Sequence, residues 1–366
     1  MSENLLLIRL KKVQTLLQQE KIDYLLIGPS ANMLYFTGLK TYADERLQLV
    51  IIPAAGTPAI IIPAMYKVKA ENVAGDRFLV LPWSDAQDPV ELLKDMVAKT
   101  DFQSVAVDDT LRAGHFIRIL EAFPKCAYIP ASRVIDNLRK FKDEAEIGLL
   151  EKAGEQADRI IEKIQAEIRP GVSERELALL IEISFKQTGE DISFKPIVAS
   201  GPNGASPHHI SGERKFKSGD FITVDCGGIF NGYCSDITRT FCLGKADGEM
   251  KDVYYAVLKA NEKALQAIEL GCSGEEADRS ARALIYEAGY GPYFLHRLGH
   301  GIGLDLHESP YLVEGNKEEI IAGMVFSIEP GIYLPGRFGV RIEDIVAMTG
   351  QGPRRLNRFT RELVEL

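Results

Sequence analysis

The chain has 366 residues, of which 46% are apolar and 26% charged, and its formal net charge is −9. This length exceeds that of one average core, so we expect two domains of ordinary globular composition. The acidic charge argues against nucleic acid or an anionic membrane surface as a partner.

The N-terminal end and the cysteines both favour a cytoplasmic protein. Residues 1–21 open with an acidic residue, and Arg9, Lys11 and Lys12 interrupt their short apolar run. They therefore predict an amphipathic helix and not a signal peptide. No apolar run reaches the roughly 18 residues that a membrane span needs. The five cysteines are an odd number without a CxxC pair, which suits reduced thiols.

Apolar runs punctuated by Gly and Pro alternate with helical segments in the N-terminal third of the chain. We expect helices at 4–21, 88–99 and 110–122, and strands at DYLLIG, LQLVIIPA, PAIIIP, RFLVLPW and SVAVDD. This alternation predicts a compact α/β domain over residues 1–128. The domain contains one histidine, His115, and no cluster of acids with histidine, so we assign no chemistry to it.

From residue 131 onward the pattern changes. The charged stretch 133–168 has a helical period and ends at Arg169-Pro170-Gly171, and Ser173 with Glu176 then forms a capping-box signature for a further helix. Helices at 248–269 and 275–288 separate two groups of strand-like pieces, which are FKPIVAS, DFITVDCGGIF and GYCSDITRTFCL, then MVFSIEPGIYL and GVRIEDIVAM. Strands clustered in this way, without strict βαβ alternation, predict an α+β domain over residues 129–366.

Two aspartates stand in strand-like sequence, where Asp is normally rare. The pair Asn231-Gly232 between them predicts a type I′ hairpin, in which residue 225 lies opposite residue 238. Asp225 and Asp236 then share one face as a diagonal pair. Two such carboxylates repel unless a proton or a cation lies between them, and one divalent ion, or two about 3.5–4 Å apart, would fit. For this pair alone, a turn cap and a solvent-exposed side chain explain the aspartates equally well.

The histidines gather in the C-terminal half of the chain. HRLGHGIGLDLHESP carries His296, His300 and His307 with glycines between them, and it lacks the HExxH pattern of zincins. A lone histidine is usually structural. In this spacing we expect one histidine to bind a metal and the others to contact substrate.

Two glutamates also lie in strand-like settings. Glu329 precedes Pro330-Gly331, and Glu343 shares one strand face with Arg341. A charged residue in a sheet core needs a partner or a metal, although a surface-facing strand explains Arg341 and Glu343 if they are taken alone. Together with Asp225, Asp236 and His300, these glutamates offer donors that suit Mn²⁺, Co²⁺ or Zn²⁺. Four carboxylates over-neutralise one divalent ion, whereas they balance two ions that share a hydroxide.

Five motifs in this order resemble the pita-bread metallopeptidases, a family that includes methionine aminopeptidase, aminopeptidase P and prolidase. The motifs are VASGPNGASPHH, VDCGGIFNGYCSDITRT, HRLGHGIGLDLHESP, IEPGIY and GVRIEDI. The N-terminal stretch RLKKVQTLLQQEKIDYLLIGPSANMLYFTG resembles the extra domain of the prolidase and aminopeptidase P branch. The resemblance implies an α/β N-terminal domain followed by an α+β pita-bread catalytic domain, most like that of a bacterial-type Xaa-Pro dipeptidase.

The resemblance also implies the metal ligands. Asp225 would chelate one metal, Asp236 and Glu343 would bridge both, and His300 and Glu329 would complete the second site. A hydroxide bridging two divalent metals would attack the scissile carbonyl, and Glu329 would carry the proton. The family favours Mn²⁺ or Co²⁺ over Zn²⁺, and it implies a homodimer.

The same resemblance assigns the substrate contacts. His208 and His307 would hold the substrate and stabilise the oxyanion, with His208 chosen over His209 because the histidine of the family follows the proline. His296 and Tyr333 match pocket positions, and Arg341 would orient the bridging acids or the substrate. Where prolidases commonly read HGTGH, this chain reads HRLGH, which changes the pocket rim at Arg297 and Leu298.

The resulting hypothesis is a peptidase that cleaves Xaa-Pro bonds in dipeptides, which is the prolidase reaction. A proline imide lacks an N–H and bends the chain, so its recognition needs a dedicated pocket. The alternatives are an aminopeptidase P that acts on longer peptides, a non-catalytic pita-bread binding module, and a metal-free hydrolase of the creatinase type. The first alternative differs from prolidase in whether a group binds the substrate carboxylate, and the five filled ligand positions argue against the other two.

Overall fold

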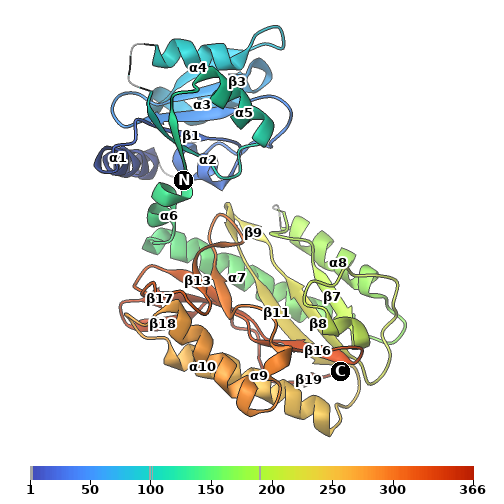
Figure 1. Cartoon of the computed structure of the whole chain (residues 1–366). Coiled ribbons are helices and arrows are strands. Elements are labelled where there is room, and N and C mark those ends of the chain that lie inside the picture. Colours follow the sequence, from blue (N-terminus) through green and yellow to red (C-terminus); the bar gives the residue numbers. More distant parts are fainter. Residues whose placement is uncertain (1–2, 99, 101, 189–190) are drawn as a thin grey trace. The chain divides into compact units, whose positions relative to one another are not determined.

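The computed structural model describes residues 3–98, 100, 102–188 and 191–366, and the chain divides into two compact units, Met1–Arg139 and Lys140–Leu366 (Figure 1). The predicted boundary between 128 and 129 lies within strand β6 (Ala127–Pro130), which pairs with β5 (Ser104–Val107). This pairing places β6 in the first unit. Helix α6 (Ser132–Arg139) follows it there and packs against α1 (Glu3–Gln19).

The first unit is a mixed sheet in the order β4-β3-β2-β1-β5-β6, with helices packed against it. Its remaining elements are β1 (Tyr24–Ile27), α2 (Ala31–Thr37), β2 (Leu49–Pro53), β3 (Ala59–Pro63), α3 (Lys67–Ala74), β4 (Leu79–Trp83), α4 (Pro89–Val97) and α5 (Ala113–Ala122). The central strands are continuous apolar runs because both faces of the sheet are buried. The predicted α/β class is confirmed, although the sequence pattern did not predict α2, α3 and β6.

Paired helices frame the second unit. They are α7 (Glu144–Gln165) and α8 (Glu174–Lys186), then α9 (Gly248–Ala267) and α10 (Gly274–Glu287). The predicted capping box of Ser173 and Glu176 starts α8, and Ser273 with Glu276 repeats it at α10. In each box the serine hydroxyl accepts from the N3 backbone N–H, and the glutamate carboxylate accepts from the N-cap backbone N–H. Two N–H groups that the helix itself cannot pair therefore have an acceptor.

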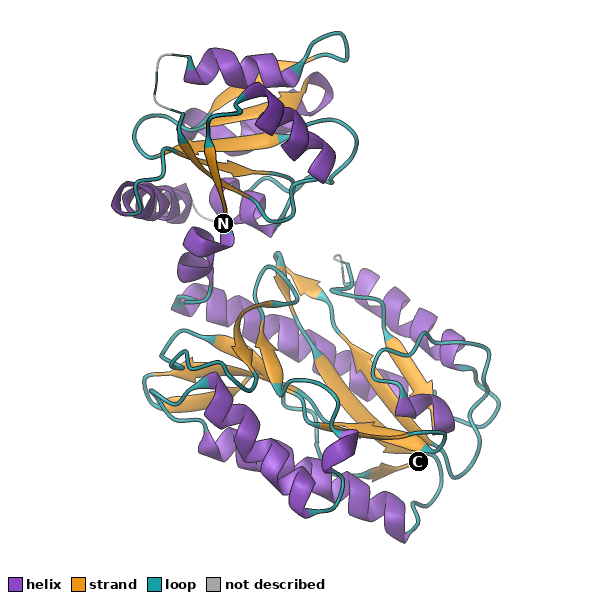
Figure 2. Ribbon diagram, viewed as in Figure 1, coloured by secondary structure: helices purple, strands orange, loops and turns teal. Residues whose placement is uncertain are grey.

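The strands of the second unit lie between these helix pairs (Figure 2). One sheet has the order β19-β11-β8-β7, the other has the order β13-β12-β14-β17-β18, and two hairpins complete the set. The bounds are β7 (Ile197–Ser200), β8 (Phe221–Cys226), β9 (Ile229–Phe230), β10 (Tyr233–Cys234), β11 (Ile237–Cys242), β12 (Gly299–Gly301), β13 (Glu308–Leu312), β14 (Val325–Ile328), β15 (Gly331–Leu334), β16 (Phe338–Arg341), β17 (Asp344–Thr349), β18 (Gly352–Arg355) and β19 (Val364–Glu365). The predicted α+β class is confirmed for this unit.

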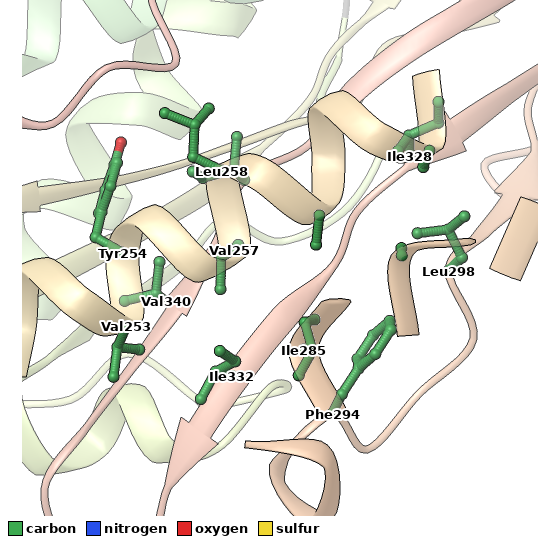
Figure 3. Close-up of a cluster of buried hydrophobic side chains, with 14 of the residues drawn as sticks. Val253, Tyr254, Val257, Leu258, Ile285, Phe294, Leu298, Ile328, Ile332 and Val340 are labelled. Carbon is green, nitrogen blue, oxygen red and sulfur yellow. The ribbon is translucent and has the colours of Figure 1, made fainter. Parts of the chain in front are cut away.

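The helix pairs of the second unit pack on its strands through separate apolar clusters. Apolar side chains of α7 and α8 pack on β7, β8 and β11. Those of α9 and α10 gather around Ile332 and Val340 of the β15–β16 hairpin, with Val257 and Ile285 among them (Figure 3). These two apolar clusters hold the sheets, and the ends of the sheet strands carry the polar side chains described below. Within the described part of the chain, no helix combines the length and the apolar character that a membrane span needs.

The hairpin predicted around Asn231-Gly232 forms in the expected register. Both turn residues have positive φ, 49° at Asn231 and 89° at Gly232, as a type I′ turn requires. Phe230 pairs with Tyr233, and Asp225 lies opposite Thr238. The turn therefore sets the position of both aspartates relative to each other.

Candidate metal centre

The predicted ligands converge on one cavity of about 440 Å³ in the second unit. Asp225 comes from β8, His300 from β12, and Glu329 directly follows β14. Asp236 directly precedes β11, and Glu343 directly precedes β17. The cavity is lined by Phe194, Ile197, Pro207, His208, Asp225, Asp236, His296, Arg297, His300, Leu306, His307, Glu329, Arg341 and Glu343.

Close backbone packing brings His300 to this site. A Cβ at Gly299 would overlap the carbonyl oxygen of Ser327 in β14, and one at Gly301 would overlap carbonyl oxygens of β13. Glycine is therefore needed on both sides of His300, because β12 lies so close to its two neighbours. The Ser327 hydroxyl accepts from the His300 N–H at 3.0 Å and donates to Glu329 Oε1 at 3.0 Å, so it orients two candidate ligands.

Three side chains fit a single cation without rearrangement. One ligand atom each of Asp236, His300 and Glu343 lies within 4.8 Å of the others. Asp225 Oδ1, Asp236 Oδ1 and Glu343 Oε1 are buried and have no hydrogen-bond partner among the described residues. Buried carboxylate oxygens are rarely left without a partner. A bound cation would satisfy these oxygens, so the donor set fits a metal site.

The tautomer of His300 gives independent support for a cation. Its Nδ1 lies 3.0 Å from the Gly301 carbonyl oxygen and must carry the proton to donate to it. Nε2 then directs a lone pair at Glu329 Oε1, 3.3 Å away, and Asp236 Oδ2, 3.7 Å away. Burial lowers the pKa of His300 to about 3, so the ring is neutral. Lone pairs that face each other in this way need a proton or a cation between them, and a backbone-anchored imidazole is the usual form of a metal-binding histidine.

The acidic groups also shift one another's ionisation. Burial, followed by the charge of Glu343, raises the pKa of Asp236 well above its ordinary value. Burial and then Glu329 do the same to Glu343, and burial raises the pKa of Glu329 to about 7. Divalent cations would reverse this repulsion, because an opposite charge stabilises the ionised carboxylate.

Asp225 and Glu343 each accept a side-chain hydrogen bond through one of their two carboxylate oxygens. Arg341 Nη2 donates to Asp225 Oδ2 at 2.5 Å, and Thr238 Oγ1 donates to Glu343 Oε2 at 2.7 Å. Arg341 Nε in turn donates to Thr238 at 3.1 Å. The free oxygens Asp225 Oδ1 and Glu343 Oε1 therefore have fixed positions. Thr238 was not among the predicted site residues, although its predicted place opposite Asp225 was a usable signal.

A chain of hydrogen bonds links Arg341 to the predicted pocket residues. Arg341 Nη1 donates to Tyr333 Oη at 2.8 Å, and Tyr333 Oη lies 2.8 Å from His296 Nε2. His296 Nδ1 lies 2.8 Å from the Arg297 carbonyl oxygen. Burial and the charge of Arg341 lower the pKa of His296 to about 4, so the ring is neutral and accepts from Tyr333. Tyr333 lies behind the cavity lining and orients His296.

The remaining predicted residues lie at the cavity's open side. His208 and His307 are both exposed, and the rings of His300 and His307 are 4.0 Å apart between centroids. Phe194, Ile197, Pro207 and Leu306 give the cavity an apolar wall. The structure thus brings together the five predicted ligands, His208, His296, His307 and Arg341, with Tyr333 in contact behind them.

Comparison with known proteins agrees with this geometry. Residues 148–350 match the model of metallopeptidase family M24. The chain belongs to metallopeptidase family M24. Residues 9–141 match the creatinase/prolidase N-terminal domain. The family, the pita-bread fold and the assignment as a metallopeptidase enzyme are therefore confirmed, whereas the role of each site residue stays a prediction.

The matches to similar proteins cover nearly the whole length of this chain. A probable dipeptidase PepE from Mycobacterium tuberculosis is 39% identical over 345 residues, which is 93% of this chain and 91% of that protein. The prolidase structure from Thermococcus sibiricus is 41% identical with a TM-score of 0.94, and the match covers 98% of each chain. An X-Pro aminopeptidase structure from Thermotoga maritima is 33% identical with a TM-score of 0.83, and the match covers 94% of this chain and 98% of that one.

Proposed function

We propose that the chain hydrolyses the Xaa-Pro bond of dipeptides, using two divalent cations held by Asp225, Asp236, His300, Glu329 and Glu343. The observation that carries this proposal is the set of three buried, unpartnered carboxylate oxygens in the cavity that the His300 Nε2 lone pair also faces. Its donors suit Mn²⁺, with Co²⁺ and Zn²⁺ as further candidates. The resemblance also supports a homodimer, which the sedimentation of the purified protein would test.

The chemistry that two cations supply at such a site is a water of lowered pKa and a polarised carbonyl. Glu329 is placed to hold a proton and pass it to the leaving nitrogen, since Ser327 fixes one of its oxygens. His208 and His307 would donate to the carbonyl oxygen as charge develops on it. The apolar wall of Phe194, Ile197 and Leu306 would receive the proline ring and exclude water around it.

The position of Arg297 favours a dipeptide over a longer peptide as the substrate. It lines the cavity and lies over the Tyr311 ring, with its guanidinium carbon 4.5 Å from the ring centroid. Its side chain has no ion pair or hydrogen bond with any described residue, whereas Arg341 is occupied by Asp225 and Tyr333. An unpaired guanidinium beside the leaving group can bind the free carboxylate of a dipeptide.

The deciding test compares Ala-Pro, Ala-Pro-amide and Ala-Pro-Ala on metal-stripped protein reloaded with Mn²⁺, Co²⁺ or Zn²⁺. A charge-assisted hydrogen bond contributes about 1.5–3 kcal/mol, so kcat/KM for the acid should exceed that for the amide by roughly 10- to 100-fold. Arg297→Gln should remove this preference, and Arg354→Gln, at an exposed position of β18, should keep it. Cleavage of Ala-Pro-Ala alone would favour the aminopeptidase, and activity that persists after metal removal would contradict the metal-dependent reaction.

A further inference from the structure

A fully buried carboxylate lies outside the metal site. Glu174 is the first residue of α8, and its exposed fraction is 0%. It accepts from Ser200 N at 2.8 Å, Ser200 Oγ at 2.7 Å and Asn203 Nδ2 at 2.9 Å. It also accepts from Gly212 N at 3.2 Å and lies 2.7 Å from His209 Nε2. Every one of these partners belongs to the segment 200–212.

The same segment carries His208 into the cavity. His209 turns its ring to Glu174, whereas the neighbouring His208 lines the cavity. From the other side, Arg341 Nη1 contacts the Pro207 carbonyl oxygen at 3.4 Å. At Gly204 a Cβ would lie 2.9 Å from the Gly339 nitrogen, so this part of the segment packs tightly on β16. The segment is therefore held between Glu174 outside the cavity and Arg341 inside it.

Glu174 is ionised in this setting. Burial alone would raise its pKa, but hydrogen bonds from Ser200, Asn203 and His209 lower the pKa below its ordinary value. Bonds to an ionised acceptor are stronger than neutral ones, and a buried charge needs several of them. An acid in the first turn of a helix also interacts favourably with the helix dipole, but that effect requires neither burial nor contacts to a distant segment. Glu144 occupies the same first position of α7 and is exposed.

We propose that Glu174 is a positioning residue for the reaction: it fixes the segment 200–212 so that His208 faces the substrate. This inference rests on the proposed function for the role of His208, whereas the anchoring of the segment stands on the hydrogen bonds alone. A displacement of about 1 Å at a substrate-contacting group costs roughly 100-fold in rate, so a distant anchor can limit catalysis.

The test has one arm that requires no catalytic activity. Hydrogen exchange of the backbone amides in 200–212 is compared between the wild type, Glu174→Gln and the control Glu144→Gln. Glu174→Gln should speed exchange in this segment at least tenfold and leave α8 protected, and Glu144→Gln should match the wild type. Unchanged exchange in Glu174→Gln overturns the proposal. If Glu174→Gln does not fold, His209→Gln removes one of the bonds to Glu174, and the same comparison decides.

The second arm is a double-mutant cycle on kcat/KM for Ala-Pro. Glu174→Gln should lower kcat/KM by roughly 10- to 100-fold with metal content unchanged, because it displaces His208. In a His208→Ala background the same change should cost less than about threefold, since residues that act through one another are not additive. An equal loss in both backgrounds overturns the proposal. If the wild type cleaves no Xaa-Pro peptide, the proposed function fails, and the exchange arm alone decides whether Glu174 anchors the segment.

Discussion

At the scale of single residues, the two oxygens of Asp225, and likewise those of Glu343, have different surroundings. Asp225 Oδ2 is fixed by Arg341 and Glu343 Oε2 by Thr238, and the second oxygen of each remains for a cation. Such outer partners hold a candidate ligand in its rotamer. Arg341 donates to Asp225, Thr238 and Tyr333 at once, so one guanidinium orients a candidate ligand and, through Tyr333, His296.

Asp236→Asn should abolish both metal binding and activity. The amide keeps the shape of the side chain but loses the charge of a candidate ligand, one oxygen of which lies within 4.8 Å of donor atoms of His300 and Glu343. Loss of an outer partner lowers metal affinity about 10- to 100-fold, so loss of a ligand should cost at least that. Metal analysis and Ala-Pro turnover measure the two effects. The same substitution at exposed Asp252 in α9 is the control, and near-normal turnover of Asp236→Asn would remove Asp236 from the site.

Tyr333→Phe should lower the free energy of unfolding and weaken substrate binding, and it should leave the metal content unchanged. The missing hydroxyl would leave Arg341 Nη1 and His296 Nε2 without this partner in a buried setting, which costs about 1–3 kcal/mol. Urea denaturation should show this loss, and KM for Ala-Pro should rise because His296 is no longer oriented. A normal denaturation midpoint would show that the hydroxyl is not needed for this network.

At the scale of elements, a second buried arginine joins the two strands that candidate ligands directly precede. Arg239 of β11 donates to the carbonyl oxygens of Thr238 and Glu343 at 2.9 and 2.6 Å, and to Asp344 Oδ1 at 2.7 Å. Its remaining donors reach the Thr360 and Phe359 carbonyl oxygens. Asp236 directly precedes β11 and Glu343 directly precedes β17, so Arg239 sets the distance between the starts of these two strands.

Arg239→Met should therefore destabilise the second unit strongly. It leaves several carbonyl oxygens and one side of Asp344 without a donor, and removal of one partner of a buried ion pair costs about 3–5 kcal/mol. The free energy of unfolding from denaturant titration gives the loss. Arg337→Met is the matched control, because its ion pair with Glu249 is half exposed and contributes about 0–1 kcal/mol. Equal effects of the two substitutions would contradict the structural role of Arg239.

The sequence predicted elements well where local chemistry decides them. Asn231-Gly232 allows positive φ at both positions, so the turn type and the register of β8 with β11 followed from two residues. Strands β12 and β13 were missed because their glycines and polar residues show no alternation. The position of β12 depends on close backbone contacts on both of its sides. Gly299 lies against Ser327 of β14, which is distant in the sequence, and Gly301 lies against Ser309 of β13, beyond a loop.

The candidate site was predictable as a set of residue types but not as a geometry. Carboxylates in strand-like sequence, together with histidines in a glycine-punctuated segment, indicated ligands, because charged residues are costly in a sheet core. No local pattern indicated that Ser327 would orient them. The predicted place of Thr238 opposite Asp225 did not by itself indicate its bond to Glu343. Glu174 is similarly hidden, because an acid in the first turn of a helix is common and only tertiary contacts show that it is buried.

At the scale of the whole molecule, the second unit contains four candidate acidic ligands in one cavity, so its stability should depend on bound cations. A ligand present at 100 times its dissociation constant stabilises the folded state by about 2.7 kcal/mol. Metal-stripped protein should therefore unfold at a lower temperature than reloaded protein, and calorimetry would measure the difference. Identical unfolding temperatures would contradict cation binding.

The metal-stripped protein should also lose stability as the pH rises. The pKa of Glu329 is raised from 4.5 to about 7, so the folded state binds more protons than the unfolded state between these values. The contribution of Glu329 to the free energy of unfolding is then complete below pH 4.5, and it falls by up to about 3 kcal/mol as the pH rises through 7. Unfolding temperatures between pH 5 and 8 test this, with Glu329→Gln expected to reduce the slope. Reloaded protein should lack this slope, because cations stabilise the ionised carboxylate.

The five candidate ligands are distributed from residue 225 to residue 343, and both sheets of the second unit supply them. During synthesis the N-terminal unit can fold first, because domains generally fold as they emerge from the ribosome. A site made of these five side chains cannot form until the strand after Glu343 has also emerged, since Glu343 follows both Asp225 and Asp236 by more than one hundred residues. If these residues bind the metal, its loading would therefore come late in the synthesis of each chain.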